Sequence, residues 1–331
     1  MREVVPNTQA IAMVTLFVVG NTLVFALGGV AGPDIWLAFL VAMVLASPML
    51  LLFARLSTLL HGEALGSALT RLYGKWPSRV IAFGYSFYAW RLGCLVVGDV
   101  TSFIQSSSLH KTPQIVLAIG FALLVLWAVK GGVEVIARWS VVMAKIVLAV
   151  LFATFLLLWT EVRLEEFLPV MYDGAMPVLR GALQLLDFPF LELVLIFWAM
   201  DRYTKENSPY KVILPGFLLG AFILLLLTST SLAVLGSHRY PVYYFPVYTA
   251  VARIDVAAFL TRLEAIVGVT FAVGSFLKMS VCLLTASKTL AHGLGFEDYR
   301  FLVTPLVLSI IPASQWFGKT TMDIEGSATK L

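Results

Sequence analysis

Residues 212–237 read VILPGFLLGAFILLLLTSTSLAVLGS, twenty-six positions without a charged side chain. An α-helix of about 20 apolar residues crosses the hydrocarbon core of a bilayer, so this stretch alone is long enough to span one. Similar runs fill most of the 331-residue chain, of which 60% is hydrophobic and 13% is charged, and the mean hydropathy is +0.92. A soluble domain carries about a quarter charged residues. The sequence therefore predicts an all-α integral membrane protein.

The apolar runs are long and unbroken, whereas the strands of a transmembrane barrel would show short segments of strict alternation. They predict about nine spans, at 8–30, 35–55, 80–105, 113–130, 139–160, 180–200, 211–236, 259–287 and 301–317. We divide this single polytopic domain, residues 1–331, into a first half (8–160), a second half (180–317) and a polar tail (318–331).

The distribution of Lys and Arg between the connections predicts the orientation. Twelve lie in segments on the side of the N-terminus and eight in segments on the opposite side. The positive-inside rule therefore places the N-terminus in the cytoplasm. Two connections on the outer side, 161–179 and 237–258, mix charged, proline and aromatic residues. We expect surface helices there, or alternatively a gate that covers an outer vestibule.

Two predicted spans are interrupted at mid-depth, one in each half. Span one carries Gly20, Asn21 and Thr22, and span six carries Asp187 and Pro189. Gly relaxes the backbone and Pro removes a hydrogen-bond donor, and the freed groups must then be satisfied by protein or by a water-filled cavity. Such breaks can simply kink packed helices, but a matched pair points to a substrate site at the midplane of a transporter fold.

Six charged residues fall inside predicted spans, three of each sign. Each would cost about 2.5–3.5 kcal/mol if it faced lipid, so we expect all six to face the bundle interior and to be paired. They fit a network of structural salt bridges or a ligand or proton site equally well. The residues are Arg91, Asp99, Lys145, Asp187, Glu192 and Lys278.

Enzyme motifs are absent from the sequence: there is no HExxH, no Walker loop and no GxSxG elbow. The four histidines fall in predicted connections without metal-ligand spacing, so we expect no metal and no cofactor. Cys94 and Cys282 lie in predicted spans and are interpreted as packing residues. No basic tract with interleaved aromatic residues indicates a nucleic-acid surface, although the net charge is +4.

Several local patterns together resemble the B-subunit family of bacterial spore germinant receptors, of the GerAB/GerKB type. The resemblance extends from about residue 8 to about residue 310. The patterns that carry it are GKW at 74–76, KGGVEVIARWS at 130–140, GALQLLDFPFLE at 181–192, FPVYTAVARID with FLTRLEA within 245–265, and GSFLKMSVCLLTASKTLAHGLGFEDYR at 274–300.

The resemblance implies a LeuT-like permease fold of two inverted five-helix repeats, as in amino acid–polyamine–organocation permeases. It also implies an amino-acid-sensing subunit in the spore inner membrane, working with an A-type membrane subunit and a C-type lipoprotein. The family carries a tenth helix, and the segment GKTTMDIEGSATKL at 318–331 is too polar to supply one. We therefore expect the second repeat to be one helix short.

The resemblance further implies ligand-binding roles for matching positions. Gly20, Asn21 and Thr22 would present backbone N–H groups to a ligand carboxylate, and Asp187, Phe188 and Pro189 would supply carbonyls and an aromatic lid. Two helix faces would close the pocket, one at Leu92 and Val96 and one at Ser280 and Leu284. Lys145 would replace a coupling sodium ion, or would lie near the cytoplasmic surface.

The expected function is therefore binding of a small nutrient, with occupancy read by partner subunits. Two alternatives remain open at this point: a secondary transporter for an amino acid or amine, and an ion-conducting subunit of the receptor. All three share the same fold and pocket, so the sequence alone does not separate them.

Overall fold

The structure of the chain is a computed structural model that describes residues 5–60, 63–200, 208–253 and 263–328, with side chains described from 265 to 317 in the last range. Within these ranges it is helical, without a strand. The long helices are α1 (Asn7–Val19), α2 (Ile35–Leu59), α4 (Lys75–Ser107), α5 (Gln114–Lys130), α6 (Val133–Leu158), α7 (Ala175–Leu185), α9 (Tyr210–Leu235), α11 (Leu263–Leu294) and α12 (Arg300–Ala328). Shorter elements are η1 (Gly20–Thr22), η2 (Gly29–Asp34), α3 (Leu65–Tyr73), η3 (Trp159–Glu161), η4 (Leu164–Phe167), η5 (Leu186–Phe190), η6 (Leu191–Leu193), α8 (Val194–Ala199), η7 (Tyr240–Val242) and α10 (Pro246–Val251).

Each predicted span corresponds to helical structure. Seven segments in the described residues are long and apolar enough to cross a membrane, and they include α7 to α8 taken as one. The other two predicted spans are α5, of 17 residues, and α1, of 13 residues, which stops at the predicted break. The predicted start of span eight at residue 259 lies outside the described residues. Large apolar side chains such as Val44 and Trp127 are exposed, as a lipid-facing surface requires.

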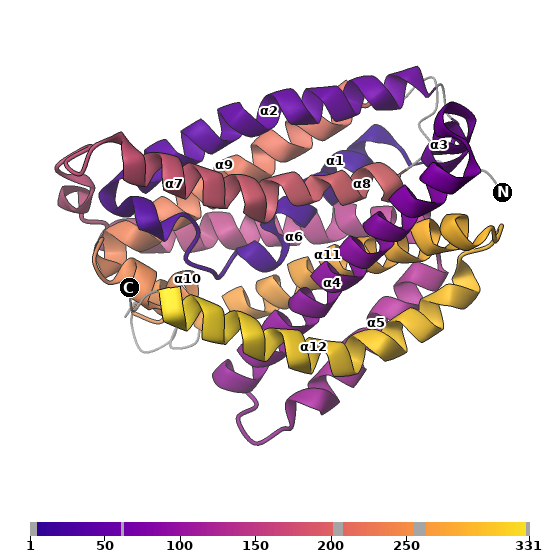
Figure 1. Cartoon of the computed structure of the whole chain (residues 1–331). Coiled ribbons are helices and arrows are strands. Elements are labelled where there is room, and N and C mark those ends of the chain that lie inside the picture. The colour runs from indigo at the N-terminus through magenta and orange to yellow at the C-terminus, as the bar shows by residue number, and fades with distance from the viewer. Residues whose placement is uncertain (1–4, 61–62, 201–207, 254–262, 329–331) are drawn as a thin grey trace.

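The helices pack as two groups (Figure 1). In one group α1, α2 and the α7–α8 segment pack with α9; in the other, α4 and α5 pack with α11 and α12. Helix α6 contacts both groups, through α1 and α9 on one side and α11 and α5 on the other. Each group thus joins two helices from the first half of the chain to two from the second, as in a LeuT-like fold.

Small residues let α1 and α9 approach closely, because α9 carries Gly216 and Gly220 four residues apart. A Cβ atom built on Gly216 would lie 2.7 Å from the Val14 Cβ, and one on Gly220 would lie 2.9 Å from the Val18 Cβ. Glycines at this spacing are typical of close helix pairs in membranes. This contact fixes the end of α1 where the first break begins.

The two long connections fold over the end of the bundle that carries α10. Asp34 accepts hydrogen bonds from the Met171 N–H at 3.0 Å, and Glu166 accepts one from the Ser237 N–H at 2.9 Å. In the second connection Tyr240 is fully buried, and burial raises the pKa of its phenol above the ordinary value. The first connection contains the turns η3 and η4, and the second contains η7 and α10; residues 254–258 of the second lie outside the described part.

Candidate functional site

The first helix break is a short turn that ends α1. The Thr22 hydroxyl donates to the carbonyl oxygens of Val18 and Val19, at 2.6 and 2.7 Å, and so satisfies groups that the ending helix leaves free. The Asn21 amide donates from Nδ2 to Asp99 Oδ2 on α4 at 2.9 Å. Its Oδ1 atom is buried and has no hydrogen-bond partner among the described residues. Break one therefore offers one buried acceptor that no described residue uses.

Backbone contact with α11 holds the first break in place. A Cβ atom built on Gly274 would lie 2.9 Å from the Gly20 carbonyl oxygen, closer than real Cβ contacts come. A Cβ atom on Gly20 would lie 3.2 Å from the Lys278 Cβ. Only glycine at Gly274 allows this approach, so the side chain of Lys278, one turn further along α11, passes directly across the break.

The second break separates α7 from α8. Phe188 has extended backbone angles (φ −133°, ψ 116°) between helical neighbours, and Pro189 follows it without an N–H donor. The chain resumes through η6, which carries Glu192, into α8. The sequence predicted an interruption at Asp187 and Pro189, and the structure has it at Phe188, between these two residues.

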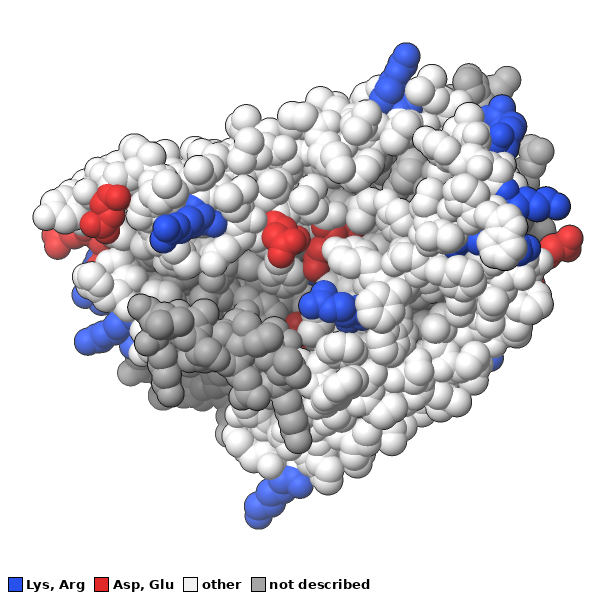
Figure 2. Space-filling model, in the orientation of Figure 1, with Lys and Arg blue, Asp and Glu red and all other residues white. Residues whose placement is uncertain are grey.

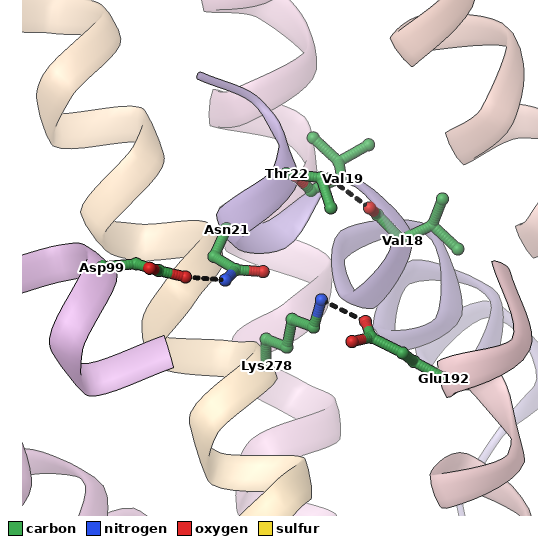
Figure 3. A network of polar contacts seen from close by, with 7 residues as sticks. All are labelled: Val18, Val19, Asn21, Thr22, Asp99, Glu192 and Lys278. Atoms are coloured by element: carbon green, nitrogen blue, oxygen red, sulfur yellow. Dashed lines mark hydrogen bonds and ion pairs between the residues drawn. The ribbon is translucent and has the colours of Figure 1, made fainter. Parts of the chain in front are cut away.

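A buried ion pair joins the second break to α11. Lys278 Nζ lies 2.5 Å from Glu192 Oε2, and both side chains are almost completely shielded, with exposed fractions of 0% and 5%. The Lys278 Nζ also lies 4.6 Å from the centre of the Phe188 ring and 5.5 Å from that of Phe17. Figure 3 shows Asp99, Lys278 and Glu192 converging from three helical segments around the break at Asn21.

An aromatic cluster covers this centre toward the α10 end of the bundle. Phe25, just beyond the first break, has its ring centre 6.3 Å from that of Phe188 and 5.9 Å from that of Phe245. Phe103 packs edge-on against Phe245 and Phe271, at 5.0 and 4.9 Å. Phe245 immediately precedes α10, so part of the 237–258 connection packs over the site.

The remaining predicted pocket residues lie in the core but apart from these contacts. Leu92 and Val96 are buried on α4, and Ser280 and Leu284 are buried on α11. The Ser280 hydroxyl donates to the Phe276 carbonyl of its own helix. At 3.6 residues per turn, Ser280 lies about 200° around α11 from Lys278. The surface of α11 that meets the first break carries Gly274 and Lys278 instead.

The expectation that all six charges face the interior holds for only part of the set. Glu192 and Lys278 are buried and paired, and half-buried Asp99 accepts from Asn21, whereas Arg91, Lys145 and Asp187 are exposed. Figure 2 shows acidic and basic atoms close together in a hollow near the middle of the face, with the other charged atoms mostly toward its edges.

A cavity of about 510 Å³ lies at the other end of the bundle, near α3. Its lining includes Ser67, Trp198, Lys288, His292 and Tyr299. The indole Nε1 of Trp198 is buried without a hydrogen-bond partner in the described residues. The sequence placed His292 in a connection, but in the structure it lies in the last turn of α11. Its ring Nε2 forms a hydrogen bond with Ser78 Oγ at 2.8 Å.

Among the residues of the centre that were not predicted from the sequence are Gly274, Ser275, Phe25 and Phe271. Gly274 and Lys278 stand one turn apart, and a small residue one turn from a charge in an apolar span is the signal that could have identified this surface. The Ser275 hydroxyl is buried and has no hydrogen-bond partner in the described residues. Phe25 and Phe271 carry no sequence signal, because aromatic residues are common throughout the spans.

Comparison with known proteins gives one family match, three related proteins and a structural likeness. Residues 4–320 match the family described as spore germination protein, or spore permease. Spore germination protein KB of Bacillus subtilis (strain 168) is 23% identical over 83% of this chain and 74% of its own length. In the same organism, spore germination protein YndE is 26% identical over 55% of this chain and 50% of its own, and the putative spore germination protein YfkT is 22% identical over 87% and 78%. The structure of Mhp1, a nucleobase-cation-symport-1 family transporter in a closed conformation with bromovinylhydantoin bound, superposes with a TM-score of 0.59, at 15% identity, over 99% of this chain and 76% of that one.

Proposed function

The chain belongs to the spore germination protein family of membrane permeases, and we propose that it senses a small nutrient, an amino acid, at the centre where its two broken helices meet α11. The observation that carries this proposal is the buried polar cluster of Asn21, Asp99, Glu192 and Lys278 inside an apolar bundle. Polar and charged groups at this depth are expensive and are characteristic of substrate sites.

The site supports sensing because it joins parts of the molecule that pack in different groups. Break one and break two belong to the α1–α2–α7–α9 group, while Gly274 and Lys278 belong to the group that contains α4, α5 and α12. A ligand between them would favour one relative position of the two groups over another. It shifts that equilibrium only by its difference in affinity for the two states.

The proposal includes the receptor context of the family. We propose that the chain resides in the spore inner membrane with its N-terminus in the cytoplasm, and that an A-type membrane subunit and a C-type lipoprotein read its state. Supporting this context are the family match and the names of the related spore germination proteins.

A secondary transporter is the second candidate, favoured by a specific observation. The fold resembles that of a symporter, a cavity lies at the α3 end of the bundle, and aromatic side chains cover the centre at the α10 end. This is the arrangement expected of one state in alternating access. Transport and sensing therefore use the same centre and differ in whether the ligand is released on the far side.

Binding and uptake of radiolabelled amino acids distinguish the two. We expect the purified chain in nanodiscs to bind at least one of the twenty common amino acids, and proteoliposomes containing only this chain not to accumulate it. Accumulation of the amino acid inside the proteoliposomes would show that the chain is a transporter and contradict the sensing proposal. Absence of binding to any of them would contradict both.

Two variants locate the site in the same assay. Asn21→Ala removes the bond to Asp99 together with the unused acceptor, and Gly20→Ala pushes a methyl group toward Lys278. Both should weaken binding about tenfold or more at normal membrane levels. Gly84→Ala, on α4, is the matched control because a Cβ atom there meets nothing within 4 Å. Unchanged affinity in both test variants would remove break one from the site.

A further inference from the structure

We propose that the Lys278–Glu192 ion pair is the recognition element for the two charges of a zwitterionic ligand. The ligand carboxylate binds the Lys278 ammonium, the ligand ammonium binds the Glu192 carboxylate, and binding replaces the direct contact between the two side chains. This inference rests on the proposed function and specifies the chemistry of the same site.

The position of the pair carries the first step of the argument. Lys278 crosses break one, since its Cβ and Cδ lie 3.2 and 3.3 Å from a Cβ atom built on Gly20. Phe188 is the non-helical residue of break two, and Glu192 follows it by four residues, in η6. The pair therefore lies where both breaks meet α11, next to any molecule bound between them.

The surroundings of the pair carry the second step. The Lys278 ammonium lies against the Glu192 carboxylate and near the rings of Phe17 and Phe188. A buried pair of this kind adds little to stability compared with apolar residues of the same size, so stability alone does not account for it. A charge left alone there would be strongly unfavourable. A ligand that separates the two charges must therefore supply both countercharges itself.

An α-amino acid meets this requirement because its ammonium and carboxylate are attached to a single carbon atom. An amine or a carboxylic acid alone would satisfy one side chain and leave the other buried without a countercharge. The geometry therefore selects zwitterions over either analogue, whatever the ligand side chain is.

Two unused polar atoms point independently to a ligand. Asn21, 1% exposed, has its Oδ1 without a hydrogen-bond partner among the described residues, and the same is true of the fully buried Ser275 hydroxyl. Ser275 lies three residues before Lys278 on α11, on the same side of the helix. The Asn21 Oδ1 atom can accept a hydrogen bond from a ligand ammonium, and the Ser275 hydroxyl can donate one to a ligand carboxylate.

Matched probes test the proposal in the full-length chain in nanodiscs. One set is alanine, ethylamine and propionate; a second is leucine, isopentylamine and 4-methylpentanoate. Each set contains the amino acid, the amine without its carboxylate and the acid without its amino group. The wild-type chain should bind one of the amino acids about tenfold or more tightly than either analogue. Equal affinity for the zwitterion and an analogue would overturn the proposal.

Charge-neutral variants then assign the two ends. Lys278→Met should abolish the preference for the amino acid over the amine, and Glu192→Gln should abolish its preference over the acid. The double variant has no unpaired charge and should fold even if a single one does not; it should lose both preferences. Lys130→Met, an exposed lysine at the end of α5, should behave as wild type.

The outcomes separate this inference from the proposed function. If the single or double variants bind amino acids, amines and acids in the wild-type order, the pair is structural and the inference is wrong while amino-acid sensing stands. If the wild-type chain binds no member of either set and none of the twenty amino acids, the proposed function fails first.

Discussion

Two regions of the molecule have the polar lining that a small-molecule site needs, and they differ in every other respect. Aromatic side chains cover the centre toward α10, and its ion pair is buried; the cavity near α3 has a volume of about 510 Å³ and is bordered by residues 296–299, between α11 and α12. The cavity offers space for a molecule, whereas the buried ion pair lies at the centre.

The difference indicates which region discriminates between ligands. Polar groups that line an open cavity are hydrated when no ligand is present, so they must lose water when a molecule binds. The charges of the centre have lost their water already, and a ligand there exchanges one partner for another. We therefore interpret the centre, rather than the cavity, as the site of recognition.

The largest effect on stability should come from breaking the ion pair. Glu192→Ala leaves Lys278 buried without its partner and should lower the free energy of unfolding by about 3–5 kcal/mol. Replacing both, with Lys278→Met and Glu192→Leu, should recover most of that loss. Denaturant unfolding in detergent micelles measures both. A single variant as stable as the wild type would mean that the centre is hydrated like the cavity.

A smaller loss should follow from closing the space between α11 and break one. Gly274→Ala places a methyl group 2.9 Å from the Gly20 carbonyl oxygen and should cost about 1–3 kcal/mol. Gly84→Ala, also within a helix but with open space around it, should be neutral or stabilise by up to about 1 kcal/mol. Thermal unfolding of the two variants side by side checks this difference, and equal Tm values would contradict the close approach.

A change at the cavity should have a modest effect on stability and leave recognition intact. Lys288 donates from Nζ to the Ala199 carbonyl at 3.0 Å. Lys288→Met should cost about 1 kcal/mol through this hydrogen bond. Amino-acid affinity, measured by equilibrium binding, should change less than twofold or so. A loss as large as that of Asn21→Ala would place recognition at the cavity instead.

The smallest effect is expected at Lys145, which is exposed on α6. Lys145→Met should change the free energy of unfolding by about 0.5 kcal/mol or less and leave ligand affinity unchanged. Binding measured in sodium and in choline buffers completes the test. A sodium requirement that appears only in the variant would restore the hypothesis that this lysine replaces a coupling ion.

The sequence predicted the spans and both helix breaks because these depend on local features. Apolar length identifies a span, and Gly20 or Pro189 interrupts one wherever the helix packs. These predictions agree with α1 ending at Val19 and with the extended angles of Phe188.

The arrangement of charges was predicted less well, because it depends on how each helix is rotated about its axis. A span that is apolar on all sides gives no preferred rotation, so the sequence does not say which face meets the bundle. Arg91, Lys145 and Asp187 were expected inside and are exposed. Similarly, Ser280 and Leu284 were chosen on α11, while Gly274 and Lys278 face the first break.

Hydrogen exchange of the chain in nanodiscs, with and without the bound amino acid, tests the central claim most directly, because it reports which backbone segments a ligand stabilises. We predict that protection changes at residues 17–25, 186–193 and 272–280, the two breaks and the part of α11 that joins them. Changes confined to residues 288–300 around the cavity, with the three central segments unaffected, would contradict the account.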